Sequence, residues 1–204
     1  MRKFEGDELV LASHNNGKIV EFSRILAPLG VEVLSAGDVD LEEPEETETT
    51  FEGNALLKAH FAAKATGKIC LADDSGLVVD AMDGAPGVYS ARYAINETGE
   101  RDFNYAMLKV LDELRGERDN RKAAFVAVLA LAWPDGHAEV FEGRVEGTIA
   151  HQITGDQGFG YDPIFIPEGE NRTFGQMSAE EKKALSHRGR AVEKLFNACF
   201  PKLV

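Results

Sequence analysis

The feature that most constrains the fold is a strand, a helix and a second strand placed close together at the start of the chain. Residues 9–12 and 31–34 are short apolar runs, and a polar turn, residues 13–18, follows the first of them. Between the turn and Gly30, apolar side chains recur at helical spacing. A helix that connects two strands in this way brings the strands into a parallel pair. The sequence therefore predicts an α/β fold.

Later segments extend this prediction to a mixed sheet with helices on both faces. A Pro-Asp-Gly turn at residues 134–136 lies between two apolar segments and is typical of a β-hairpin, whose strands are antiparallel. The expected strands are residues 68–72, 77–81, 124–133, 137–149 and 163–166. Helices are expected from Thr49 to Thr66, with Thr49 and Glu52 at capping-box spacing, at residues 103–114, after Ser178, which forms a second capping box with Glu181, and at residues 192–199.

The composition suits a single globular domain spanning residues 1–204. Of the 204 residues, 44% are hydrophobic and 28% are charged. The formal net charge of −13 repels a phosphate polymer, so we expect no nucleic-acid partner. The longest apolar run, residues 123–133, is too short for a membrane helix, and residues 1–13 show no signal peptide. Cys70 and Cys199 lack zinc-site spacing, so we expect reduced thiols in a cytoplasmic protein.

The turn at residues 13–18 is the first candidate for binding a ligand. It reads Ser-His-Asn-Asn-Gly-Lys and leads into the first predicted helix. Unpaired backbone N–H groups and the helix dipole favour an anion there, and Lys18 adds a full positive charge. The turn lacks the Walker A spacing, and an ordinary connection with a surface lysine is the alternative interpretation. We therefore treat it as a candidate phosphate site.

Two acidic segments are candidates for metal binding and proton transfer. Asp73 and Asp74 follow a predicted strand, so their side chains should point to opposite sides, and only one should face a given site. A carboxylate there can bind Mg²⁺ or accept a proton from water. The acidic loop, residues 42–48, could supply a second carboxylate from Glu45 or Glu46. The alternatives are a turn capped by Asp side chains and a solvated loop.

Residues 158–163, Gly-Phe-Gly-Tyr-Asp-Pro, are a candidate for binding a flat base. Phe159 could stack on the ring, while Asp162 or a backbone amide binds its edge. Stacking of a base on an aromatic side chain contributes roughly 1–3 kcal/mol. The alternative is a tight turn with a buried Phe.

A basic segment follows near the C-terminal end. Lys182 precedes His187 by five residues, so the two side chains converge only if the helix ends between them, near Ser186. Arg188 can donate in a planar fork to a base oxygen or to phosphate. The alternative is a cationic helix C-terminus, which the helix dipole stabilises by itself.

In chain order, these segments resemble the motifs of the inosine triphosphate pyrophosphatase family, most closely its bacterial branch. The resemblance covers nearly the whole chain. One departure is Ser-His-Asn at residues 13–15, where the family often has Thr-Gly-Asn. The matching segments are residues 11–18 (LASHNNGK), 50–55 (TFEGNA) with Lys58, 72–77 (ADDSGL), 84–93 (GAPGVYSARY), 158–163 (GFGYDP) and 186–189 (SHRG).

The resemblance implies an elongated mixed β-sheet flanked by helices, with two lobes and a nucleotide cleft between them, and a homodimer. It also implies Mg²⁺-dependent hydrolysis of inosine and xanthosine triphosphates, including deoxy forms, to monophosphate and pyrophosphate. Asp74 would bind the metal and accept a proton from water, and Glu46 would be the second metal ligand, with Glu43 and Glu45 as alternatives. The residues that would contact the purine nucleoside triphosphate are Ser13, His14, Asn15, Asn16, Gly17, Lys18, Lys58, Ser75, Phe159, Gly160, Tyr161, Asp162, Lys182, His187 and Arg188.

Two other functions stay open on the sequence alone. One is a Maf-like nucleotide pyrophosphatase that selects a different base. The other is a nucleotide-binding protein without catalytic activity, against which we weigh the presence of Asp73, Asp74, Lys18 and Lys58.

Overall fold

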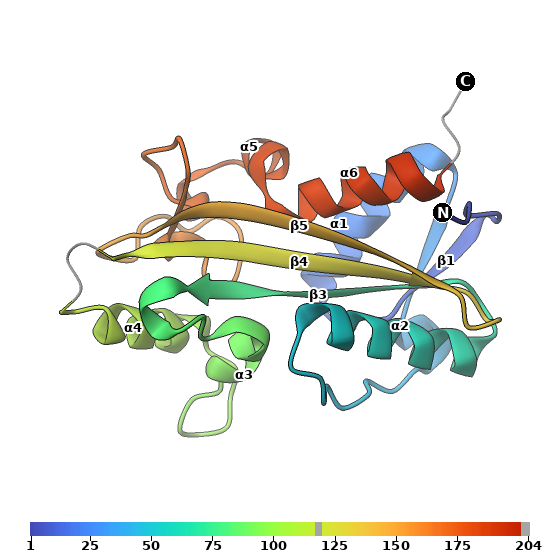
Figure 1. The fold of residues 1–204 in the computed structure, drawn as a ribbon, viewed down its shortest axis with the longest axis horizontal. Coiled ribbons are helices and arrows are strands. Elements are labelled where there is room, and N and C mark those ends of the chain that lie inside the picture. The colour runs from blue at the N-terminus through green and yellow to red at the C-terminus, as the bar shows by residue number, and fades with distance from the viewer. Residues whose placement is uncertain (117–119, 201–204) are drawn as a thin grey trace. The chain divides into compact units, whose positions relative to one another are not determined.

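The strands form one mixed β-sheet, and the helices pack beside it (Figure 1). The computed structural model describes residues 1–116 and 120–200. In sheet order, the strands are β2 (Glu32–Ser35), β1 (Glu8–Leu11), β3 (Cys70–Val79), β4 (Lys122–Ala132), β5 (Ala138–Ile149) and β6 (Phe165–Pro167). β1 pairs in parallel with β2 and β3, whereas β5 pairs antiparallel with β6. The expected α/β class with a mixed sheet is confirmed.

Most helices begin and end close to the predicted positions, but the last one begins at His187 instead of residue 192, and the short helix Ser90–Tyr93 was not predicted. α1 starts after Asn15, whose side chain caps it, and the capping box of Ser178 and Glu181 starts α5 as expected. The first capping residue was predicted wrongly, because Thr50, not Thr49, accepts the N–H of Gly53. The helices are α1 (Asn16–Leu26), α2 (Phe51–Thr66), α3 (Ser90–Tyr93), α4 (Phe103–Glu113), α5 (Ala179–Leu185) and α6 (His187–Cys199).

One correction concerns the strand that carries the two aspartates. We predicted a strand at residues 68–72, a turn, and a second strand at 77–81, but β3 runs without a break from Cys70 to Val79. Two buried carboxylates in a strand are tolerated here because Asp73 and Asp74 each pair with a lysine. The two aspartates therefore lie within this strand, and they do not indicate where it ends.

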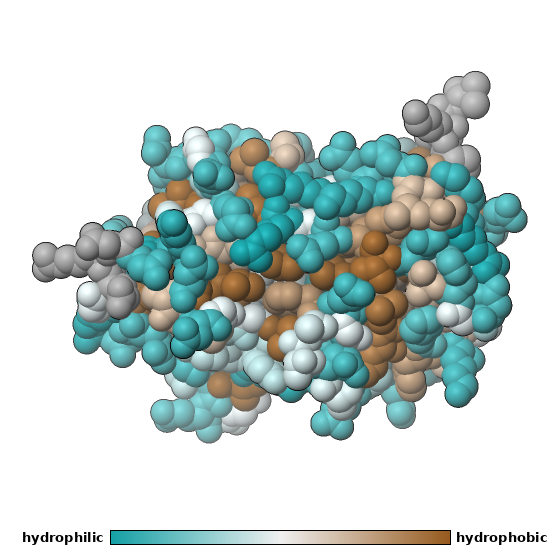
Figure 2. Space-filling model, viewed as in Figure 1, coloured by the Kyte–Doolittle hydropathy of each residue, from teal (hydrophilic) through white to brown (hydrophobic). Residues whose placement is uncertain are grey.

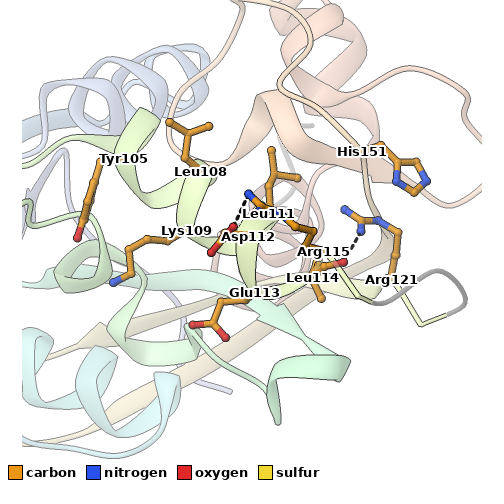
Figure 3. Close-up of a pocket in the computed structure, with 10 residues that line it drawn as sticks. All are labelled: Tyr105, Leu108, Lys109, Leu111, Asp112, Glu113, Leu114, Arg115, Arg121 and His151. Carbon is orange, nitrogen blue, oxygen red and sulfur yellow. Dashed lines mark hydrogen bonds and ion pairs between the residues drawn. The ribbon is translucent and has the colours of Figure 1, made fainter.

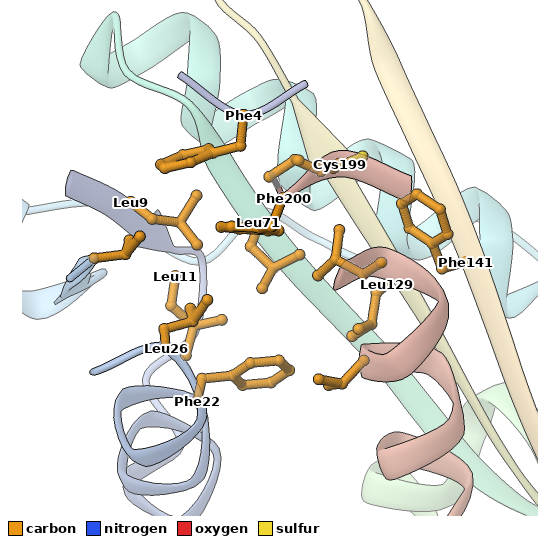
Figure 4. Close-up of a cluster of buried hydrophobic side chains, with 14 of the residues drawn as sticks. Phe4, Leu9, Leu11, Phe22, Leu26, Leu71, Leu129, Phe141, Cys199 and Phe200 are labelled. Atoms are coloured by element: carbon orange, nitrogen blue, oxygen red, sulfur yellow. The ribbon is translucent and has the colours of Figure 1, made fainter. Parts of the chain in front are cut away.

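Two compact units divide the chain, and each has its own hydrophobic core. Unit 1 comprises Met1–Asp74, Val128–Glu142 and Ala191–Val204, and unit 2 comprises Ser75–Ala127 and Gly143–Arg190. The core of unit 1 gathers side chains from the N-terminal segment, β1, α1, β3, β4 and α6 (Figure 4). Its labelled members are Phe4, Leu9, Leu11, Phe22, Leu26, Leu71, Leu129, Phe141, Cys199 and Phe200.

The core of unit 2 is richer in aromatic contacts. The ring centroid of Phe125 lies 4.6 Å from that of Phe165 and 4.8 Å from that of His187. Contacts of this kind add to the free energy of burial. They give the segments after β6 a firm attachment, because Phe174 also packs on Phe165.

Hydrophilic residues surround the hydrophobic atoms that remain visible on the face drawn in Figure 2. Among the described residues, no helix combines the length and apolar character needed to cross a membrane.

Candidate active site

The turn before α1 is organised by its own side chains. Asn15 Oδ1 accepts the backbone N–H groups of Gly17 (2.9 Å) and Lys18 (3.2 Å), and Ser13 Oγ accepts that of Asn15 (3.1 Å). The expectation of unpaired N–H groups is therefore wrong at these three positions. The positive potential of the turn comes instead from the helix dipole and from the Lys18 side chain.

His14 uses its side chain within the protein. Its Nε2 lies 2.9 Å from the carbonyl oxygen of Leu41, which is buried just before the acidic loop. A carbonyl oxygen can only accept, so Nε2 is the protonated ring nitrogen in this contact. Binding of nucleotide by His14 and Asn16 stays a prediction.

Lysine side chains from two helices contact the part of β3 that lies in unit 1. Lys18 of α1 forms an ion pair with the Asp73 carboxylate. Lys58 of α2 is buried, and its Nζ donates to Asp74 Oδ1 (2.9 Å), to Glu46 Oε1 (2.6 Å) and to the Asp73 carbonyl (3.1 Å). Each lysine thus contacts a different carboxylate of the aspartate pair, but both ammonium groups also donate to the Asp73 carbonyl, at 3.3 Å from Lys18 and 3.1 Å from Lys58, so the two ion pairs adjoin.

The acidic loop brings one glutamate to this cluster. Glu46 is half-buried and bonded to Lys58, whereas Glu43 and Glu45 are exposed. Of the three candidates for the second metal ligand, Glu46 therefore contacts the same lysine as Asp74.

Burial and charge act against each other at Lys58 and Asp74. Burial raises the pKa of Asp74, and the attraction of Lys58 offsets only part of this effect. At Lys58 burial lowers the pKa, but the charges of Asp74 and Glu46 outweigh it, so the pKa is raised. Lys58 is consequently a permanent cation, and Asp74 is a carboxylate with enhanced affinity for a proton.

The donor set fits a divalent cation with hard-oxygen preference. Asp74 Oδ2 is buried and has no hydrogen-bond partner within the described residues. The described chain also contains no group of three or more His, Cys, Asp or Glu side chains suited to a metal. Mg²⁺ commonly takes only one or two carboxylates from the protein and completes its shell with water and substrate phosphates. Asp74 and Glu46, which both accept from Lys58, would be such a pair.

In unit 2, two cations lie against the face of an exposed aromatic ring. Lys182 Nζ lies 4.6 Å, and the Arg188 guanidinium carbon 5.6 Å, from the ring centroid of Phe159. The Phe159 residue is 43% exposed, which is high for a phenylalanine beside two charges. The ring and the cations together can hold a flat, oxygen-bearing heterocycle.

The loop that carries Phe159 is fixed by Asp162. Asp162 Oδ2 accepts the backbone N–H of Phe159 (2.8 Å) and pairs with Lys182. A Cβ on Gly158 would lie 2.0 Å from that oxygen, so glycine is required there. Burial raises the pKa of Asp162, and the attraction of Lys182 offsets only part of the effect. Asp162 thus positions both the stacking ring and a cation.

Tyr161 is committed to the interior of unit 2. Its residue is 3% exposed, its hydroxyl donates to the Ser90 carbonyl (2.8 Å), and its ring packs edge-on against Phe103. Tyr161 therefore ties the loop to the segment around Ser90, and the predicted contact with nucleotide at Gly160 and Tyr161 stays untested.

The predicted helix break near Ser186 is confirmed, because α5 ends at Leu185 and α6 begins at His187. The side chains that converge are Lys182 and Arg188, whereas the ring of His187 stacks on Phe125. Arg188 Nη2 donates to Ser75 Oγ (3.0 Å), so Ser75 belongs to the same group.

Two further residues join these sets without having been assigned a role from the sequence. Asn54 Oδ1 accepts the backbone N–H of Glu48 (3.0 Å), and the Ser90 carbonyl accepts the hydroxyl of Tyr161. Asn54 and Ser90 both fall within the motifs matched above, which is the one signal that could have indicated them.

A cavity of about 730 Å³ elsewhere in unit 2 contains none of the predicted site residues. It is lined by α4 side chains together with Arg121 and His151 (Figure 3). Arg121 donates to the carbonyl oxygens of Leu114, Ile149 and Ala150 at 2.7–3.2 Å, so its charge supports the surrounding backbone. This cavity is therefore not the candidate active site.

The chain is similar over nearly its full length to known proteins. A protein of Agrobacterium fabrum named dITP/XTP pyrophosphatase is 53% identical, with 98% of this chain and 99% of the relative covered. A Brucella melitensis protein of the same name is 54% identical, with 96% and 94% covered. The solved structure of the Staphylococcus aureus Ham1 protein has a TM-score of 0.82 at 43% identity, with 92% of this chain and 95% of that chain covered.

A HAM1 protein structure from Coxiella burnetii agrees as well, with a TM-score of 0.85 at 40% identity and with 93% and 96% of the two chains covered. The family profile described as Ham1 matches residues 9–198. The family resemblance read from the motifs is thereby confirmed, and this chain belongs to the Ham1 family.

Proposed function

We propose that this chain hydrolyses purine nucleoside triphosphates with a non-standard base, such as ITP, dITP and XTP, to the monophosphate and pyrophosphate. Full-length similarity to proteins named dITP/XTP pyrophosphatases supports the substrate class. The observation that carries the chemistry is the buried Asp74 carboxylate. One of its oxygens binds Lys58, and the other has no partner within the described residues.

Charge balance supports a requirement for Mg²⁺. The cluster in unit 1 contains two lysines, Lys18 and Lys58, but three carboxylates, from Asp73, Asp74 and Glu46. The net negative charge there would repel a triphosphate. A divalent cation that binds both the carboxylates and the phosphates would remove this repulsion. We assign Asp74 and Glu46 as its protein ligands. When bound, Mg²⁺ neutralises charge that develops on the leaving pyrophosphate.

The chain's own residues then have distinct tasks in the hydrolysis. Water attacks the α-phosphorus, the bond to the bridging oxygen breaks, and pyrophosphate leaves. Asp74 accepts a proton from the attacking water. Lys58 keeps Asp74 in place, and Lys18 at the start of α1 attracts the phosphates.

Selection of the base is the proposed task of unit 2. Lys182 and Arg188 carry donors that suit the 6-oxo group of hypoxanthine and xanthine, whereas adenine presents an amine at that place. Guanine shares the 6-oxo group and differs by a 2-amino group. Burying that amine without a partner costs roughly 1–3 kcal/mol, or about 10- to 100-fold in affinity.

A substrate panel tests the proposal. Pyrophosphate release is measured with Mg²⁺ and with EDTA for ITP, XTP, GTP, ATP and a modified pyrimidine triphosphate. We expect ITP and XTP to have the highest kcat/KM and EDTA to abolish release. Equal turnover of all purines would contradict the assignment of base selection, preference for the pyrimidine would indicate a Maf-like enzyme, and no release would indicate a binding protein. The homodimer implied by the family resemblance and the cytoplasmic location expected from the cysteines stay predictions.

A further inference from the structure

Glu46 lies on a loop without regular secondary structure, yet the cluster in unit 1 needs it at a defined place. Most of the acidic loop is exposed, and repulsion among its glutamates favours an extended, mobile chain. Glu46 pairs with Lys58 in the middle of this segment, and hydrogen bonds to neighbouring elements hold its two ends.

The N-terminal end is held by His14. The His14 Nε2–H donates to the carbonyl of Leu41, which directly precedes the acidic loop and is buried. His14 belongs to the polar turn at residues 13–18, whose backbone is fixed by the Asn15 cap of α1. One end of the loop is thus tied to the start of a helix.

The C-terminal end is held by α2. The side chain of Asn54 is buried, and its Oδ1 accepts the backbone N–H of Glu48 (3.0 Å). Glu48 packs so closely on the helix that a Cβ on Gly53 would lie 2.7 Å from the Glu48 Cβ. The same helix carries Lys58, so this end and the partner of Glu46 belong to one rigid element.

We propose that His14 and Asn54 are positioning residues that anchor the acidic loop at both ends and so hold Glu46 beside Lys58 and Asp74. The proposal rests on the proposed function where it concerns Mg²⁺. It gives a role to the histidine that replaces the glycine often found in the family turn. Residues that orient a metal ligand typically change metal affinity or activity by about 10- to 100-fold when removed.

Four variants of the full chain separate anchoring from other effects. His14→Ala removes the donor, and His14→Gln keeps a side-chain N–H of similar reach. Gly53→Ala favours the helix itself but collides with Glu48. Glu42→Gln is the matched control, because it removes a charge from an exposed position of the same loop.

The first measurement is the backbone amide order parameter of residues 42, 43 and 45–47 in the metal-free protein, from ¹⁵N relaxation; residue 44 is a proline and has no N–H group. We expect about 0.85 in the unmodified chain and below about 0.6 in His14→Ala and Gly53→Ala. The second is the Mg²⁺ concentration for half-maximal pyrophosphate release, which should rise about tenfold in these two variants. His14→Gln should keep the order parameters of the unmodified chain, and Glu42→Gln should stay close to the unmodified chain in both measurements.

Unchanged order parameters in His14→Ala and Gly53→Ala would overturn the anchoring. So would a His14→Gln variant as defective as His14→Ala, since packing and not the hydrogen bond would then matter. If the unmodified chain releases no pyrophosphate, the proposed function fails, and the relaxation measurement alone decides whether the ends of the loop are anchored.

Discussion

The two units surround their cations with different neighbours. In unit 1, Lys18 and Lys58 are each paired with carboxylates, and carboxylates outnumber them. In unit 2, Lys182 also pairs with a carboxylate, that of Asp162, but it lies with Arg188 over the face of Phe159, which stays exposed. The first arrangement suits a metal-bound phosphate group, and the second suits a flat ring that carries oxygen. Cations of the same formal charge can thus suit different ligands because of their neighbours.

The largest expected effect comes from replacing Asp74 in unit 1, the carboxylate that we assign both to metal binding and to proton transfer. Asp74→Asn keeps the oxygen that accepts from Lys58 but cannot take a proton from water. Because general base catalysis contributes about 10²- to 10⁴-fold, we expect kcat for ITP to fall at least about 100-fold. The dissociation constant for ITP should change much less. Single-turnover kinetics and calorimetry measure the two quantities.

The control is Asp80→Asn, which removes an exposed carboxylate after the same strand. Turnover near that of the control would remove Asp74 from the reaction. A loss of ITP binding as large as the loss of turnover would instead show that the two tasks are not divided between the two units.

The sequence predicted the parts of these sets that depend on local spacing. The polar turn before α1, the capping box at Ser178 and the break near Ser186 follow from neighbouring residues, and all three are present. The family motifs also indicated Lys58, which forms an ion pair with Asp74 in the structure. Local rules suffice wherever the partners lie within one or two helical turns.

Pairings between distant residues could not be predicted in this way. Lys18 meets Asp73, 55 positions away, and His14 meets Leu41, 27 positions away. Such contacts depend on the register of β1 against β3 and on the path of a loop, which no local pattern specifies. The choice of Glu46 over its neighbours depends on the same path.

A matched pair of glycines sharpens the assignment of base binding to unit 2. Gly158 and Gly160 both have positive φ, +75° and +66°, so alanine strains the backbone similarly at each. A Cβ on Gly158 would displace Asp162, whereas one on Gly160 meets nothing closer than Phe103 at 3.8 Å. We expect Gly158→Ala to raise KM for ITP about tenfold more than Gly160→Ala, because a charge-assisted contact contributes roughly 1.5–3 kcal/mol. Steady-state kinetics with similar kcat for both variants is the measurement.

Equal KM values for the two variants would mean that backbone strain alone matters and that Asp162 does not position Phe159 and Lys182. A fall in kcat without a change in KM would assign the loop to the chemical step. Either result would erase the contrast between the units.

The smallest expected effect is a difference in how stability depends on pH. Burial raises the pKa of Asp162 above its ordinary 3.8, so the folded chain binds this proton more tightly than the unfolded chain. Its contribution to the free energy of unfolding is therefore greatest below pH 3.8 and declines as pH rises through the folded pKa. In unit 1, hydrogen bonds from the Ser35 side chain and backbone lower the pKa of the exposed Asp38, which reverses the sign.

Thermal unfolding of Asp162→Asn and Asp38→Asn across this pH range measures both contributions against the unmodified chain. The advantage of the unmodified chain over Asp162→Asn should shrink as pH rises from about 4, whereas its advantage over Asp38→Asn should grow as pH rises toward 3.8 and be constant above it. Parallel slopes for the two variants would contradict the contrast. A slope of the opposite sign for Asp162 would mean that Lys182 dominates over burial, so that unit 2 holds its buried carboxylate as tightly paired as unit 1 holds its own.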